Sequence, residues 1–173
     1  MPPPSHTARW PELPFAAWKD TAATLHLWTQ AVGKVRLALA PWLNHSWHVA
    51  LYVTARGLTT SPIPCGARDI QIDFDFIDHV LWLRTSDCHF RQLMLTPMPV
   101  AEFYQNLIIA LRELAVDVAI RTMPCEIPDA IPFDQDTVRR AYDADYANRF
   151  WRVLHSILQP PARIGEQRLL VMV

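Results

Sequence analysis

The sequence predicts an α+β fold: a mostly antiparallel sheet of about five to six strands, a long N-terminal helix and two further helices. Helical periodicity dominates the N-terminal part, short alternating segments follow, and two more helical stretches come later. With 173 residues, the chain is long enough to bury one core without disulfides or metals. We expect an extended arm over residues 1–14, a single domain over residues 15–158 and a tail over residues 159–173.

The long helix is expected to begin near Asp20, a typical N-cap residue, and to end near residue 40, because Pro41 would stop it. His26 lies on a strip of this helix adjacent to its apolar stripe. The stripe follows a 3-4-3-4 spacing and consists of Leu25, Trp28, Val32, Val35 and Leu39.

After the helix, the period changes to two, which predicts a strand over residues 47–56 that Gly57 interrupts. One face of this strand carries His48, Ala50, Tyr52, Thr54 and Arg56. The other face carries Trp47, Val49, Leu51, Val53 and Ala55.

A second strand is predicted over residues 68–76, and residues 80–85 and 90–95 predict a hairpin. In the second strand the apolar residues alternate with polar ones. The apolar side consists of Ile70, Ile72, Phe74 and Phe76, and the polar side of Gln71, Asp73 and Asp75.

The C-terminal part predicts a helix over residues 100–114, a strand over residues 116–122 and a helix from residue 143 or 144 to residue 158. The last residues of the tail are apolar. They either add an edge strand or lack their proper partner.

Composition argues against several classes of function. The formal net charge of −1 carries no basic excess, so we expect no nucleic-acid partner. No secretory signal is present, and no apolar run approaches the roughly 20 residues that span a bilayer, so we expect a cytoplasmic protein without a membrane partner. The three widely spaced cysteines predict free thiols rather than a zinc or disulfide framework.

The candidate catalytic residues are His48, Asp73 and Asp75. Asp73 and Asp75 are two apart on one strand, so they share a face at roughly 7 Å. That spacing suits a general acid/base pair or two carboxylates around a metal. It equally suits the solvated face of a half-exposed sheet.

A divalent metal is a candidate cofactor, with His26, His48 and Asp73 as its candidate ligands. This set requires the long helix to cross the same sheet face as Asp73. His45 is a weaker candidate, because its odd spacing from His48 places the two side chains on opposite faces of a regular strand. The alternative is that each histidine lies at the edge of the core with its ring N–H satisfied.

The candidate substrate-binding residues are Arg56, Tyr52, Thr59 and Thr60. An arginine beside a glycine turn and several hydroxyl groups suits a carboxylate or phosphate group of a small molecule. The chain has no glycine-rich phosphate-binding motif. The alternative is that these residues shape the turn and cap strand ends.

Long stretches of the chain resemble a family of uncharacterised bacterial proteins, a domain of unknown function. The matching stretches are WPELPFAAWKDTAATLHLWTQAVGKVRLAL (Trp10 to Leu39), NHSWHVALYVTARGLTTSPIP (Asn44 to Pro64), IDFDFIDH (Ile72 to His79), TMPCEIPDAIPFDQD (Thr122 to Asp136) and YDADYANRFWR (Tyr142 to Arg152). The resemblance implies no assigned activity, cofactor or catalytic residue.

Two departures from this family stand out. The turn Ser86-Asp87-Cys88 replaces the Ser-Asp-Gly that relatives tend to show, so we expect strain there. The relatives also look longer, so this chain resembles their N-terminal half. Its ending, HSILQPPARIGEQRLLVMV, predicts a truncated or frame-shifted version.

Three hypotheses of function follow from the sequence, and they leave open whether the protein is an enzyme. The first is a small-molecule site on the polar sheet face, catalytic or not, with or without a metal. The second is a non-catalytic domain whose Trp-rich helix and sheet enclose an apolar ligand. The third is a protein-interaction domain, or a half-protein that associates with itself through the C-terminal tail.

Overall fold

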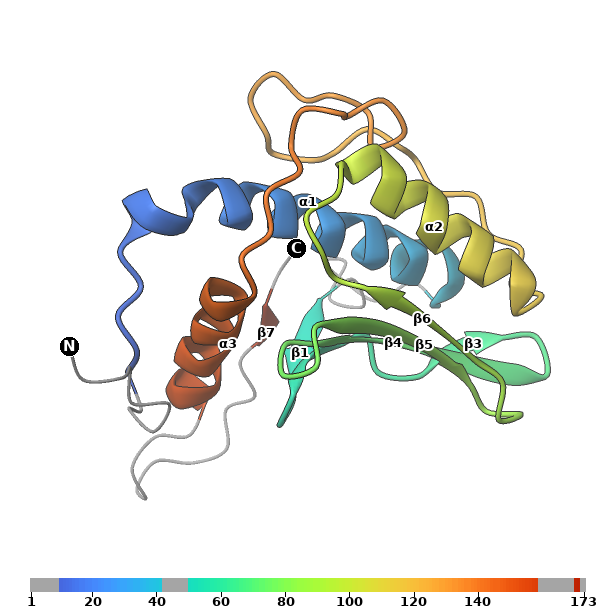
Figure 1. Cartoon of the computed structure of the whole chain (residues 1–173). Coiled ribbons are helices and arrows are strands. Elements are labelled where there is room, and N and C mark those ends of the chain that lie inside the picture. The colour runs from blue at the N-terminus through green and yellow to red at the C-terminus, as the bar shows by residue number, and fades with distance from the viewer. Residues whose placement is uncertain (1–9, 42–49, 159–169, 172–173) are drawn as a thin grey trace.

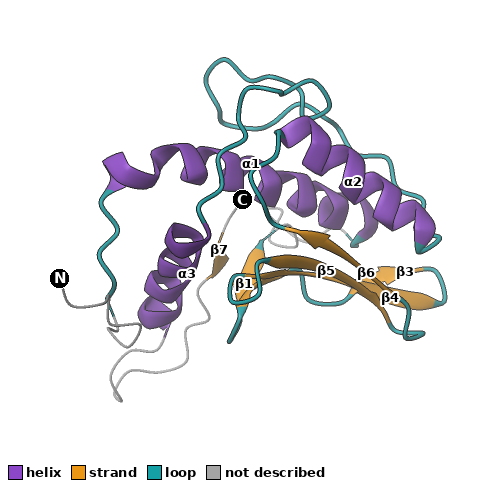
Figure 2. Ribbon diagram, in the orientation of Figure 1, coloured by secondary structure: helices purple, strands orange, loops and turns teal. Residues whose placement is uncertain are grey.

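The computed structural model describes residues 10–41, 50–158 and 170–171. These residues form three helices and an antiparallel sheet, as predicted (Figures 1 and 2). In chain order the elements are α1 (Phe15–Leu39), β1 (Leu51–Val53), β2 (Gly57–Thr59), β3 (Ile63–Cys65), β4 (Arg68–Asp75), β5 (Val80–Thr85), β6 (Phe90–Met94), α2 (Val100–Glu113), α3 (Ala144–Leu158) and β7 (Leu170–Val171).

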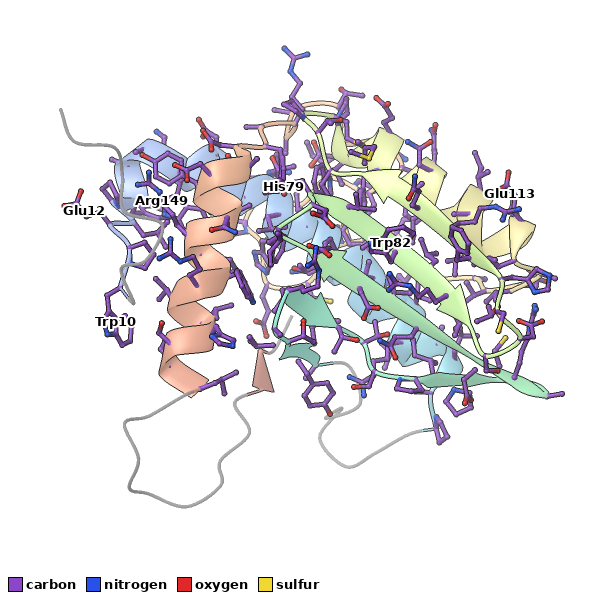
Figure 3. The ribbon with its side chains drawn as sticks, turned by 60° about the horizontal axis from the view of Figure 1, so that its bottom comes forward. Trp10, Glu12, His79, Trp82, Glu113 and Arg149 are labelled. Carbon is purple, nitrogen blue, oxygen red and sulfur yellow. The ribbon has the colours of Figure 1, made fainter. Side chains whose placement is uncertain are left out.

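The sheet has one helix-covered face and one open face. Its strand order is β6-β5-β4-β2-β1-β7, and β3 also pairs with β4. Helices α1 and α2 lie over one face, and α3 stands beside the end of the sheet near β1 (Figure 1). No helix of the described chain lies over the opposite face, which Figure 3 brings forward. The strands therefore bury one set of alternating side chains and present the other.

Strand β4 shows this alternation clearly. Ile70, Ile72 and Phe74 are at most 1% exposed and join the core under the helices. Asp73 and Asp75, at the alternate positions, belong to the open face, because successive side chains of a strand point to opposite faces. The predicted division of this strand is confirmed.

Strands β2 and β3 both pair with the same edge of β4. Gly57–Thr59 pairs with the C-terminal half of β4, and Ile63–Cys65 pairs with its N-terminal half. Between them, Thr60 donates its N–H to the carbonyl of Ile72 and accepts the N–H of Ile72 on its hydroxyl. The two short strands therefore form one interrupted strand with a local bulge.

The first predicted strand is shorter than expected. It was predicted over residues 47–56, but β1 covers Leu51–Val53 and residues 47–49 lie outside the described residues. Thr54 ends β1, because its hydroxyl accepts the N–H of Gly57 while its own N–H donates to the carbonyl of Gly57. This tight turn joins β1 to β2, so Gly57 begins a strand.

Two other predictions about elements were wrong. Helix α1 begins at Phe15, directly after Pro14, because the fixed φ of proline suits the start of a helix. Residues 116–122 were predicted as a strand but have no regular structure. At least one of their backbone groups bonds to a later loop instead of a strand: the carbonyl of Thr122 accepts the N–H of Phe133.

Stacked aromatic rings form the middle of the core between α1, α2 and the sheet. The indole of Trp28 on α1 is fully buried and stacks on Phe103 of α2, with ring centroids 4.7 Å apart. It also stacks on Tyr142, which precedes α3, at 5.4 Å. One ring from α1 therefore packs against two later parts of the chain.

The turn between β5 and β6 has the strain expected from its sequence. Cys88 has φ +67°, a left-handed conformation that glycine adopts without a steric penalty. The turn is held by Arg68, which donates to the carboxylate of Asp87 at 3.0 Å and to backbone carbonyls at the end of α2.

Part of the tail adds an edge strand, which was one of the two expected outcomes. Leu170–Val171 pairs antiparallel with β1. The rest of the tail lies outside the described residues, and self-association through it stays a prediction. Within the described ranges, no helix is long and apolar enough to cross a membrane. The cytoplasmic location also stays a prediction.

We predict that Gly57→Ala destabilises the fold by about 3 kcal/mol. A Cβ at this position would lie 1.8 Å from the carbonyl oxygen of Phe74, so β2 would be pushed off β4. Gly66→Ala is the matched control: φ is +66° and no neighbouring atom lies within 4 Å, so only torsional strain of about 1 kcal/mol is expected. Urea unfolding measures both variants, and equal losses would contradict the steric explanation.

Candidate functional site

Three of the predicted site residues meet on the open face of the sheet. Arg56, Asp73 and Asp75 line a cleft of about 300 Å³, which we call the sheet-face site. Trp82, from the same cleft, is labelled on this face in Figure 3. The full lining consists of Thr54, Ala55, Arg56, Gln71, Asp73, Phe74, Asp75, Trp82 and Arg84.

The carboxylate of Asp75 holds two turns together. Its Oδ1 accepts the backbone N–H groups of Ile77 and Asp78 at 2.9 and 3.0 Å, and its Oδ2 accepts Nε of Arg56 at 2.6 Å. Burial disfavours the charge, but these hydrogen bonds outweigh burial and hold the pKa of Asp75 below its usual value. Both oxygens therefore stabilise the turn after β4 and attach the β1–β2 turn to it.

Asp73 belongs to a more exposed cluster. It accepts Nε2 of Gln71 at 2.9 Å and Nη1 of Arg84 at 2.9 Å, and its side chain is 19% exposed. The guanidinium of Arg84 also lies 4.5 Å from the centre of the Trp82 ring. Asp73 and Asp75 thus share a face, but each carboxylate already has an arginine partner, which favours the solvated-face alternative over an acid/base pair.

The candidate substrate-binding residues divide into two groups. Arg56 lines the sheet-face site with a side chain that is 51% exposed. The hydroxyls of Thr59 and Thr60 bond to the backbone instead: Thr59 accepts the N–H of Ser61, and Thr60 donates to the carbonyl of Ser61. Tyr52 packs its ring against the guanidinium of Arg36 at 5.0 Å. These contacts correspond to the turn-shaping alternative for both threonines.

The described residues do not assemble the predicted metal set. His26 lies on α1, which covers the core face of the sheet, whereas Asp73 lies on the open face. The condition that the helix crosses the face of Asp73 is therefore not met, and His48 lies outside the described residues. Within residues 10–41, 50–158 and 170–171, no three His, Cys, Asp or Glu side chains form a group that could hold a metal.

A larger cleft opens on the helix side of the sheet; the second hypothesis expected an apolar site between helix and sheet, but of the lining residues only His26 was named as a candidate. It has a volume of about 480 Å³, and we call it the α1–α3 cleft. It is bordered by α1, β2 and α3. Its lining residues are Phe15, Trp18, Lys19, Ala22, Ala23, Leu25, His26, Thr29, Leu58 and Phe150.

The hollow of this cleft follows from side-chain size along α1. Trp18 and His26 lie about two turns apart on this helix, and between them the lining is formed by Ala22 and Ala23. On the far side, the ring of Phe150 lies 5.3 Å from that of Trp18. Small residues between bulky ones therefore leave the space, and this spacing was the available signal in the sequence.

A hydrogen-bonded clasp fixes the ring of His26. The amide of Gln30 pairs twice with the backbone of Cys125: Nε2 donates to the carbonyl and Oε1 accepts the N–H, both at 2.9 Å. Nε2 of Gln30 also lies 3.1 Å from Nε2 of His26. Because Gln30 is the donor, Nε2 of His26 accepts, and the neutral ring carries its proton on Nδ1.

His79 lies at the end of β4 and β5 that is nearer α3 (Figure 3). Its Nδ1 is 2.9 Å from the hydroxyl of Tyr142. Burial lowers the pKa of His79, and the nearby carboxylates of Asp75 and Asp78 offset this only in part. Burial also raises the pKa of Tyr142 well above its usual range, so the phenol stays protonated. The pair joins the sheet to the segment before α3.

We predict that Asp75→Asn destabilises the fold by about 2 kcal/mol and Asp73→Asn by less than about 1 kcal/mol. Asp75 is 7% exposed and holds two backbone N–H groups and Arg56, whereas Asp73 is 19% exposed and bonds to the side chains of Gln71 and Arg84. Urea unfolding at pH 7 measures the difference. Equal losses in the two variants would contradict the structural role assigned to Asp75.

The lowered pKa of His79 predicts a loss of stability as the pH falls below the unfolded value of about 6.5. Below that value the unfolded chain binds the proton more readily than the folded chain, so unfolding is favoured. His79→Asn should flatten the slope of unfolding free energy between about pH 7 and pH 5, and asparagine tolerates the φ of +53° at this position. An unchanged slope would show that another group causes the pH dependence.

Comparison with known proteins adds a family to this description. A search of curated proteins and a search of solved structures each found no significant match. The model of a family of unknown function, DUF5996, matches residues 10–159. This range contains both clefts and all three helices. The chain belongs to DUF5996, a family of unknown function.

Proposed function

We propose that this protein binds an apolar small molecule in the α1–α3 cleft and does not transform it chemically. The observation that supports this most directly is the lining of the cleft. Seven of its ten lining residues are apolar, and Lys19, His26 and Thr29 are the exceptions. Ligand sites typically have about 300–1,000 Å³ and a mostly apolar lining with a few polar groups. The cleft, at about 480 Å³, fits that description.

The walls of the cleft come from elements that other contacts hold in place. Asn148 on α3 donates to the carbonyl of Phe76 at 2.9 Å, and Trp151 donates to the carbonyl of Thr54 at 2.9 Å. Arg149 donates to the carbonyl of Glu12 (both residues are labelled in Figure 3) and, within α3, to the carboxylate of Asp145. The bonds of Asn148 and Trp151 fix α3 against two turns of the sheet, and that of Arg149 to Glu12 joins α3 to the segment before α1, so the walls of the cleft are held by contacts that need no ligand.

The absence of catalysis is inferred from how the charged groups are used. The best candidates for acid/base chemistry, Asp73 and Asp75, bond to arginines and to the backbone on the other side of the sheet. The cleft itself is lined by no carboxylate and no cysteine. A ligand there would meet hydrogen-bond donors and apolar surface, which suits binding rather than a reaction.

A second candidate is the binding of a small anion at the sheet-face site. Arg56 and Arg84 both line this site, and their side chains are 51% and 47% exposed. A guanidinium has five N–H donors, and the contacts to Asp73, Asp75 and Asp78 use only some of them. The remaining donors would face a carboxylate or phosphate.

We predict that Ala22→Phe weakens binding of a neutral apolar probe, N-phenyl-1-naphthylamine, by about tenfold or more. The added ring would occupy the hollow beside Trp18 and compete with the probe. Ala17→Phe is the matched control, because Ala17 is exposed on the same helix and does not line the cleft. Fluorescence titration measures binding, and thermal melts check that both variants fold.

Binding that is unchanged in Ala22→Phe would contradict the proposal, and so would equal weakening in both variants. The sheet-face site is tested with inorganic phosphate, whose binding should be lost in Arg84→Met and unchanged in Ala22→Phe if that site binds anions. The neutral probe and phosphate therefore separate the two candidates.

A further inference from the structure

We infer that the ligand of the α1–α3 cleft is an amphipathic acid: an apolar body with a carboxylate or similar anionic group that binds Lys19. This inference rests on the proposed function, because it assigns the chemistry of the ligand to the same cleft. It adds that the ligand carries an anionic group, which the apolar lining alone does not require.

The lining of the cleft carries positive but no negative charge. Lys19 lines it, and none of the other lining residues is an aspartate or glutamate. Lys19 has no hydrogen bond or ion pair with any residue in the described part of the chain. Some exposed cations of this protein have carboxylate partners, as Arg56 has in Asp75 and Arg91 has in Glu113. An unpaired ammonium beside an apolar cleft favours an anionic group over a neutral or cationic one.

His26 is a second polar residue with a hydrogen-bond donor in the lining of the cleft. The clasp with Gln30 makes Nε2 of His26 an acceptor, so Nδ1 carries the proton of the neutral ring. An imidazole N–H donates to an oxygen of a ligand without requiring a second charge. The cleft therefore presents a cation and a neutral donor, and both suit oxygen acceptors.

The distance between these two groups defines the ligand further. Lys19 and His26 are seven residues apart on α1, which corresponds to about 10 Å along a helix axis. Ala22 and Ala23 lie between them, and Leu25 and Leu58 contribute apolar surface. The ligand should therefore carry its acid group at one end of an apolar body and a hydrogen-bond acceptor toward the other.

The test uses two fluorescent probes of similar shape and different charge. 8-Anilinonaphthalene-1-sulfonate is anionic, and N-phenyl-1-naphthylamine is neutral. We predict that Lys19→Met weakens sulfonate binding about fivefold and changes binding of the neutral probe less than about twofold. Added salt should weaken sulfonate binding to the unmodified protein, because the ammonium lies near the surface.

The matched control is Arg112→Met, which removes one exposed positive charge from α2 without touching the cleft. It should leave both probes unaffected. Equal weakening of both probes by Lys19→Met, or of the sulfonate by both variants, would overturn the acid group. If Ala22→Phe abolishes binding of both probes and Lys19→Met changes neither, the acid group is wrong while the proposed function stands. If Ala22→Phe changes neither probe, the proposed function fails as well.

Discussion

The structure depends on strand β4, which pairs along both edges and buries only one of its faces. On one edge it holds β2 and β3, and on the other it holds β5 over six register pairs. Ile70, Ile72 and Phe74 must lie under α1 and α2, because leaving them in water would cost about 2 kcal/mol or more for each side chain. The polar residues of β4 are therefore fixed on the opposite face. Each of the two clefts lies on one side of this division.

The division explains why the two clefts differ in chemistry. On the open face the polar residues of neighbouring strands are close together, and they neutralise one another as Arg56–Asp75 and Arg84–Asp73 pairs. On the core side, the α1–α3 cleft is bordered by α1, β2 and α3. Its lining is mostly apolar, like the core. Asp75 connects the two sides only mechanically: it holds the turn after β4, whose Phe76 carbonyl accepts Asn148 of α3.

Local patterns predicted most of the fold but only part of the site. The alternation in β4 and the stripe on α1 are repeated over many residues, so each was readable without knowledge of the tertiary structure. The alternation did not predict that β1 ends before residue 56. The strand ends there because the hydroxyl of Thr54 accepts the N–H of Gly57 and so closes a turn. Asp73 and Asp75 share a face as strand parity predicts, whereas Arg56 reaches Asp75 from the turn between β1 and β2 rather than from the predicted strand. The lining of the α1–α3 cleft was not predicted as a set, because its far wall, Phe150, reaches α1 only through the long-range docking of α3.

The most direct test of this account is a map of where a bound ligand touches the protein. Backbone amide chemical shifts of isotope-labelled protein, recorded during titration with 8-anilinonaphthalene-1-sulfonate, give that map residue by residue. We expect the largest shifts at Ala22, Leu58 and Phe150, which come from α1, β2 and α3 and all line the cleft. Large shifts at Asp73 and Arg84 with unchanged Ala22 and Phe150 would contradict it, because the ligand would then lie on the other face of β4.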